Sequence, residues 1–182
     1  MDTPLIADGL CIRPFGAEDA TAFVNAIHES LESVGAWLPW CRDSYCAADA
    51  QTWFDLCAAN LSAGHAYDVG IFSENGDEFY GGISINQLNR MHNFGNIGYC
   101  VRQSCQRKGI AIRAVRLMAA HGFNQLGLTR LEIVAAVDNS ASRGVAEKAG
   151  AVFECVARNR LVLNGSPIAA AVYSLAPGQH GF

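Results

Sequence analysis

Apolar and polar residues alternate in several short stretches of the first hundred residues, the spacing that a half-buried strand requires. The expected strands are 10–14, 67–72, 79–88 and 94–101. Between the first two of them the apolar residues change to helical spacing, which predicts one helix that begins at residues 17–19 and a second over 48–63. The last three strands follow one another with short connections, so we expect them to be antiparallel neighbours.

The second half of the chain alternates helices with strands. A helix is expected over 109–126, an apolar strand over 130–137 and a short helix over 139–148. The first of these helices crosses over between two strands, which makes strands 94–101 and 130–137 parallel. Two more strands, over 152–163 and 168–175, flank Asn164-Gly165, the strongest hairpin signal in the sequence.

Together these elements predict an α/β (α+β) fold with about seven strands in one mixed, mostly antiparallel sheet that is flanked by helices. A length of 182 residues favours a single domain, 1–182, whose core spans about 8–176. The hydrophobic content of 51% is ample for that core.

Composition indicates the compartment and the kinds of partner to expect for this chain. No apolar run is long enough to span a membrane, and Met1-Asp2-Thr3-Pro4 lacks the basic start of a signal peptide. Seven cysteines without a Cys-x-x-Cys pair predict reduced thiols in the cytoplasm and no metal site. A net charge of −4 gives no reason to expect direct nucleic-acid binding.

Residues 96–118 contain the clearest candidate functional site, because their pattern predicts a strand, a turn rich in hydrogen-bond donors and a helix. A turn that runs into a helix points backbone N–H groups at one spot, and the helix dipole makes that spot favourable for an anion. Cationic side chains lie nearby at Arg102, Arg107, Lys108 and Arg113. The sequence therefore predicts a phosphate or pyrophosphate site, although it matches neither the Walker A loop nor Gly-x-Gly-x-x-Gly.

Within this stretch, Gln106-Arg107-Lys108-Gly109-Ile110-Ala111 resembles the Gln/Arg-x-x-Gly-x-Gly/Ala signature of the GNAT acyl-CoA N-acyltransferases. It follows Ile97-Gly98-Tyr99 and precedes a segment, 139–150, similar to the Asn-x-x-Ser…Glu-Lys-x-Gly segment of the RimJ/RimL-like branch, which acetylates protein N-termini. Trp37-Leu38-Pro39-Trp40 also resembles that branch. The resemblance covers roughly residues 10–175.

The resemblance implies a sheet that splays between its two central parallel strands, with acetyl-CoA as co-substrate in the gap. The pantetheine arm would lie along Tyr99 to Val101, with Asn139 as a further contact. The pyrophosphate would sit on the loop, whose implied contacts are Gln106, Arg107, Lys108, Gly109, Ile110 and Ala111.

Two catalytic roles follow from the implied reaction, which is direct attack of a neutral amine on the thioester. A backbone N–H at Cys100 or Val101 is the candidate donor to the tetrahedral oxyanion. Ser142 would contact the CoA sulfur and protonate the thiolate, a role otherwise left to water. Ser142 and Asn139 also suit a purely structural role at a helix start. Trp37 and Trp40 are candidate substrate contacts, with plain core packing as the alternative.

A general base is not apparent. Relatives often carry Glu where this chain has Asn96, and residues 156–161 lack the glutamate of the ribosomal-protein enzymes.

Without a base, the acceptor amine must lose its proton easily. Deprotonating a lysine of pKa about 10.4 at pH 7 costs about 4.6 kcal/mol, whereas deprotonating an α-amine of pKa near 7.8 costs about 1 kcal/mol. We therefore expect an N-terminal α-amine as acceptor. The alternatives are a small amine, such as a polyamine or an antibiotic, and a domain that binds acyl-CoA without catalysis. The expected assembly is a monomer or a homodimer.

Overall fold

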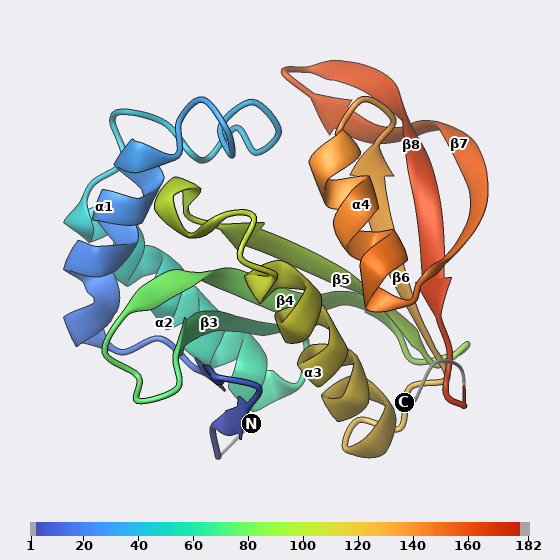
Figure 1. Ribbon diagram of the computed structural model, residues 1–182, viewed down its shortest axis with the longest axis horizontal. Helices are drawn as coiled ribbons and strands as arrows, with labels where there is room; N and C mark the ends of the chain where they lie inside the picture. Colours follow the sequence, from blue (N-terminus) through green and yellow to red (C-terminus); the bar gives the residue numbers. More distant parts are fainter. Residues whose placement is uncertain (1–2, 179–182) are drawn as a thin grey trace.

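A computed structural model describes residues 3–178 of the chain, and one sheet runs through nearly all of it (Figure 1). The strands are β1 (Leu5–Ala7), β2 (Leu10–Arg13), β3 (Tyr67–Ser73), β4 (Phe79–Asn89), β5 (Phe94–Val101), β6 (Arg130–Ala136), β7 (Val152–Leu163) and β8 (Ser166–Leu175). Their order across the sheet is β1-β2-β3-β4-β5-β6-β8-β7, and only β5 and β6 are parallel neighbours. The mixed, mostly antiparallel sheet is thus confirmed, with eight strands where about seven were expected. The additional strand, β1, has only three residues, too few for alternation to reveal it.

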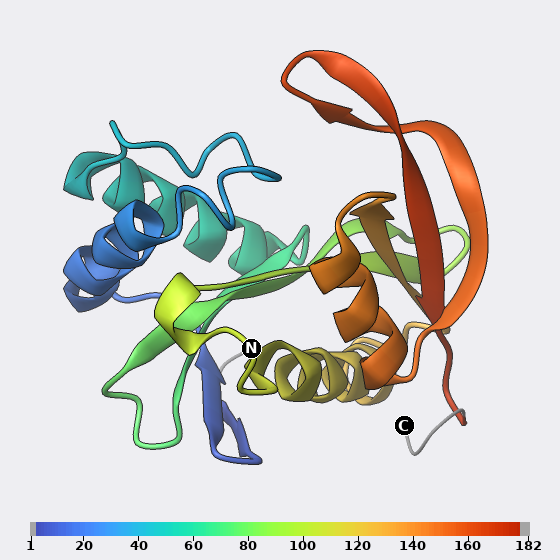
Figure 2. The ribbon, with the colours of Figure 1, turned by 45° about the horizontal axis from the view of Figure 1, so that its top comes forward.

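Two pairs of helices cover the two faces of this sheet (Figures 1 and 2). The helices are α1 (Ala20–Glu29), α2 (Ala47–Ala63), α3 (Ile110–Asn124) and α4 (Ser140–Ala149). Short 3₁₀ turns at Ala17–Asp19 and Gln103–Cys105 precede α1 and α3. The expected helices are confirmed, with ends that differ by a few residues because the terminal turns tighten or fray.

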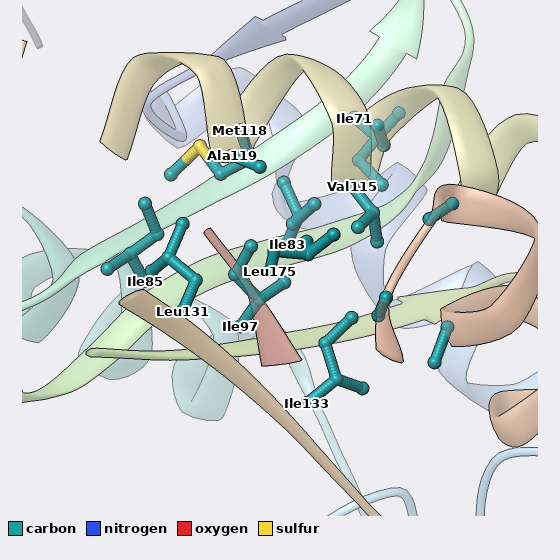
Figure 3. Packing of buried hydrophobic residues seen from close by; sticks show 14 of the residues in the cluster. Ile71, Ile83, Ile85, Ile97, Val115, Met118, Ala119, Leu131, Ile133 and Leu175 are labelled. Atoms are coloured by element: carbon teal, nitrogen blue, oxygen red, sulfur yellow. The ribbon is translucent and has the colours of Figure 1, made fainter. Parts of the chain in front are cut away.

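Alternation along the strands separates two hydrophobic clusters, one for each face. The larger cluster packs α3 and α4 against odd-numbered residues of the central strands, among them Ile83, Ile97 and Ile133 (Figure 3). The smaller cluster packs α1 and α2 against Phe72 and Phe79. Because successive side chains point to opposite faces, the even-numbered residues of β5 and β6 face away from α3 and α4.

The last two strands form the predicted hairpin, a long ribbon that projects beyond the rest of the sheet (Figure 2). Asn164 and Gly165 both have positive φ, 49° and 77°, as the mirror-image turns that suit a two-residue hairpin require. β7 is the edge strand, and Val156 and Val162 on it are more than half exposed.

The two central strands part, as the resemblance implied. β5 pairs with β6 only through Phe94, Gly95 and Asn96, whose partners are Arg130, Leu131 and Glu132. Beyond this fork β6 continues beside β8, and within residues 3–178 the remaining half of β5 has β4 as its only strand neighbour. Figure 1 shows the two strands diverging above their paired ends. A gap therefore opens in the middle of the sheet from Ile97 onward.

His121 of α3 gives the first testable prediction, because burial lowers its pKa and neither ring nitrogen has a hydrogen-bond partner within the described residues. The unfolded chain then binds a proton more readily than the folded one, so stability falls as pH drops below about 6.5. Glu29 and Glu154, whose pKa values are lowered to about 2, lose their contribution only below about 4.5. We expect His121→Phe to flatten the free energy of unfolding between pH 6.5 and 5 in urea titrations. An unchanged slope in that window would contradict the assignment.

Candidate acetyl-CoA site

The gap is lined on one side by the free edge of β5. The N–H of Arg102 donates to the carbonyl of Tyr80 on β4 at 2.8 Å, and Cys100 lies opposite Gly82 in the next hydrogen-bonded pair. Since hydrogen-bonding direction alternates along a strand, the amides of Tyr99 and Val101 face the gap and that of Cys100 faces β4. Of the two amides predicted to bind the oxyanion, Val101 is therefore the one that the register directs into the gap.

The loop at the open end of the gap leads into α3. Gly109 is the N-cap residue and has φ of 74°, and the N–H groups of the first helical turn that follows have no acceptor within the helix. Gln106 fixes the loop, since its Nε2 donates to the carbonyl oxygen of Val101 at 3.0 Å and to Ser33 Oγ at 3.2 Å. Ile110 is buried in the core and offers only its backbone. The loop has the geometry of an anion site at a helix N-terminus.

The four cations of this region divide into two groups. The guanidinium of Arg102 donates to both carboxylate oxygens of Glu29, at 2.9 and 2.6 Å, and this contact lowers the pKa of Glu29 to about 2. Arg113 donates to the carbonyl of Asp8. Both arginines thus hold the loop and α3 in place. Arg107 and Lys108 are exposed and make no hydrogen bond or ion pair with the described part of the protein, so their charges face solvent at the loop.

Ser142 on α4 lies across the gap from β5. Tyr99 Oη donates to the carbonyl of Ser142 at 2.8 Å and lies 3.1 Å from Ser142 Oγ. Burial raises the pKa of Tyr99 to about 12, so the phenol stays protonated near neutral pH. Asn139 Oδ1 accepts the N–H of Ser142 at 3.0 Å, which confirms Asn139 as the helix N-cap; its contact with the pantetheine arm stays a prediction.

Cys100 faces the other side of the sheet, toward α1 and the loop that follows it. Its side chain, Cys41 and Trp40 line a cavity of about 20 Å³. Burial raises the pKa of the Cys100 thiol to about 11, so it is not a thiolate at neutral pH. Trp37 is half-buried and Trp40 is 38% exposed, so neither belongs to the buried core. Of the two, Trp40 borders this cavity, and contact with the acceptor stays a prediction for both.

One further group at the fork was not predicted from the sequence. Glu132 is the register partner of Asn96, so two residues far apart in sequence meet where the strands part. Only the pairing of β5 with β6 could have revealed this, because nothing in the local pattern around Glu132 marks a site.

Within residues 3–178, no cluster of three or more His, Cys, Asp or Glu side chains has the arrangement of a metal site. No helix there combines the length and the apolar character that a membrane crossing needs.

A parted pair of parallel strands, with an anion-binding loop at its open end and free strand amides along its edge, defines the acyl-CoA N-acyltransferase class of fold. Comparison with known proteins agrees. Residues 9–152 match the family model described as "Acetyltransferase (GNAT) domain". The chain belongs to the GNAT family of N-acetyltransferases.

Three known proteins are similar to this chain over nearly its whole length. The chain is 30% identical to "Putative ribosomal N-acetyltransferase YdaF" of Bacillus subtilis (strain 168), over 96% of this chain and 95% of that one. The structure of "a putative ribosomal-protein-serine acetyltransferase" from Vibrio cholerae matches with a TM-score of 0.86 and 29% identity, over 97% and 98% of the two chains. A RimL ribosomal L7/L12 α-N-protein acetyltransferase in complex with coenzyme A shares the fold, with a TM-score of 0.83 and 21% identity over 94% and 96%.

Proposed function

We propose that this N-acetyltransferase moves an acetyl group from acetyl-CoA to the N-terminal α-amine of a protein. The observation that carries the proposal is the gap itself. It offers the amides of Tyr99 and Val101 to an extended pantetheine arm on one side and Ser142 on the other. The amides after Gly109, with Arg107 and Lys108, would hold the pyrophosphate.

The reaction needs few groups beyond these. The amine nitrogen attacks the thioester carbon, and the carbonyl oxygen becomes an oxyanion. One N–H of β5 that faces the gap, at Tyr99 or Val101, stabilises this oxyanion, and the other binds the pantetheine arm. The carbon–sulfur bond then breaks, the thiolate takes a proton from Ser142 or from water, and the nitrogen loses one proton. Cys100 has no role in these steps, because its N–H faces β4 and its thiol, whose pKa burial raises to about 11, is not a nucleophile at neutral pH.

Two arguments favour an α-amine as acceptor. Deprotonating an α-amine at pH 7 takes about 3.6 kcal/mol less than deprotonating a lysine side chain. The names of the Bacillus and Vibrio relatives refer to ribosomal acceptors, which supports a protein substrate here.

We also propose that the enzyme works in the cytoplasm with reduced thiols, as a monomer or homodimer. Sedimentation of the purified protein measures its oligomeric state.

An amine panel tests the proposal. Peptides with a free N-terminal serine or alanine and no lysine are compared with the same peptides N-blocked and carrying one lysine, with release of free CoA as the readout. We expect turnover of the α-amine peptides to exceed that of the lysine peptides at least tenfold. Faster reaction of the lysine peptides or of a polyamine would overturn the acceptor assignment. Binding of acetyl-CoA without CoA release from any amine would favour a non-catalytic domain.

A further inference from the structure

Asn96 and Glu132 stand side by side at the fork of the sheet. They are the last paired residues of β5 and β6, and partners in a parallel pair project from the same face. Their neighbours Ile97, Leu131 and Ile133 pack under α3 (Figure 3). Asn96 and Glu132 therefore project from the opposite face, the one that also carries Cys100.

Asn96 belongs to a row of hydrogen bonds that runs across three strands. Its Nδ2 donates to Asn86 Oδ1 at 3.1 Å, and Asn86 Nδ2 donates to Ser84 Oγ at 2.9 Å. The Ser84 hydroxyl in turn bonds the carboxylate of Asp68. Every donor points toward Asp68, an arrangement in which each bond polarises the next. The row fixes the carboxamide of Asn96 with its oxygen, Oδ1, free to accept at the fork, since no described residue donates to it.

Gly98 follows Asn96 on the same face of β5. A Cβ at Gly98 would lie 3.1 Å from Ser84 Oγ and 3.9 Å from Asn86 Nδ2. A side chain at position 98 would press on the Ser84 hydroxyl, so glycine leaves the row undisturbed.

Glu132 is anchored through one oxygen and more loosely held at the other. Arg130 donates to Glu132 Oε1 from Nε at 3.1 Å and from Nη2 at 2.9 Å. Arg160 of β7 lies 3.7 Å from Oε2, beyond hydrogen-bond length. The side chain is 19% exposed. Glu132 thus offers a carboxylate that is fixed through Oε1, and no described residue donates a hydrogen bond to Oε2.

We propose that Asn96 Oδ1 and Glu132 Oε2 form the amine subsite, with Glu132 as the proton acceptor of the reaction. The inference rests on the proposed function, because it supplies the base that acetyl transfer needs. A primary amine brings two hydrogens: one is held by Asn96 Oδ1, and the other passes to Glu132 Oε2 as the nitrogen–carbon bond forms and the nitrogen becomes cationic. The proton then leaves Glu132 to solvent. Asp68 and Ser84 are positioning residues that act through Asn96.

Glu132→Gln tests the proposal, and Glu154→Gln is a matched control. Glu154 shares Arg130 with Glu132, at 2.7 and 2.6 Å, but lies on β7 away from the fork. We expect Glu132→Gln to lower kcat tenfold to a hundredfold on the α-amine peptides, the lower end of what general bases contribute. The KM for acetyl-CoA stays within threefold of wild type. Glu154→Gln keeps kcat within threefold.

Chemical rescue separates a proton acceptor from a structural carboxylate. In Glu132→Ala, added formate should restore part of kcat, and it should not change kcat of Glu154→Ala. Thermal melting of each variant reports folding.

Asp68→Asn should raise the KM for the acceptor peptide at least threefold and leave the KM for acetyl-CoA unchanged. The proposal fails if Glu132→Gln keeps kcat within threefold of wild type, or if Glu154→Gln loses as much kcat as Glu132→Gln. It also fails if formate restores no activity to folded Glu132→Ala. A wild-type enzyme that releases no CoA with any amine would overturn the proposed function and this inference together, whereas an active wild type with an unaffected Glu132→Gln overturns the inference alone.

Discussion

Replacing Gly109 with valine should weaken acetyl-CoA binding by a hundredfold or more while the protein still folds. Gly109 holds φ of 74° at the N-cap of α3, a conformation that costs an L-residue about 1–2 kcal/mol and is worse for a β-branched one. The loop would relax away from this φ, and the first-turn amides would turn from the pyrophosphate. Each hydrogen bond to a charged group contributes about 1.5–3 kcal/mol, so losing one or two already gives the expected factor. Isothermal titration calorimetry with acetyl-CoA measures it.

The same helix provides the control for this prediction. Gly127 lies just beyond the C-terminal end of α3 with φ of 65°, and a Cβ on either glycine would meet no atom within 4 Å. Gly127→Val should therefore lose similar stability to Gly109→Val in urea unfolding, yet bind acetyl-CoA as wild type does. Equal loss of affinity in both variants would mean that Gly109 acts through general stability and that the pyrophosphate lies elsewhere.

Local signals in the sequence account for what could be predicted of the fold. The hairpin at Asn164-Gly165 and the helix after Gly109 depend on residues whose backbone preferences are strong by themselves. Strand directions followed from the lengths of the connections. The splay did not follow from any pattern; it came from the family resemblance, because parting of two strands depends on what each strand packs against rather than on its own residues.

In the candidate site, the partners of several charged and polar side chains could not be predicted from the sequence. Arg102 and Arg113 look like phosphate ligands in the sequence, yet Glu29 and the backbone of Asp8 hold them. A charged residue can be assigned to a surface from sequence, but its partner depends on tertiary geometry. The pairing of Asn96 with Glu132 is of the same kind, since it needs the register of two strands that are joined through a whole helix.

The contact between Tyr99 and Ser142 makes the chemistry of the leaving group testable. Ser142→Ala should lower kcat a hundredfold or more, within the range for general acid catalysis, because the thiolate would lose its nearest proton donor. Affinity for CoA should change less than threefold. Ser140→Ala, an exposed serine at the start of the same helix, should keep wild-type kcat. Steady-state kinetics on the best α-amine peptide gives these values.

Tyr99→Phe completes the test by asking whether the phenol acts alone or through the serine. Tyr99 stays protonated near neutral pH and its Oη donates to the Ser142 carbonyl, so its removal should displace the serine and lower kcat about tenfold. If Tyr99 acts by positioning Ser142, the double variant should be no slower than Ser142→Ala alone, because a positioning contact is worthless once the group it positions is gone. Additive losses would instead identify Tyr99 as an independent proton donor, and a Ser142→Ala enzyme within threefold of wild type would give the acid role to water.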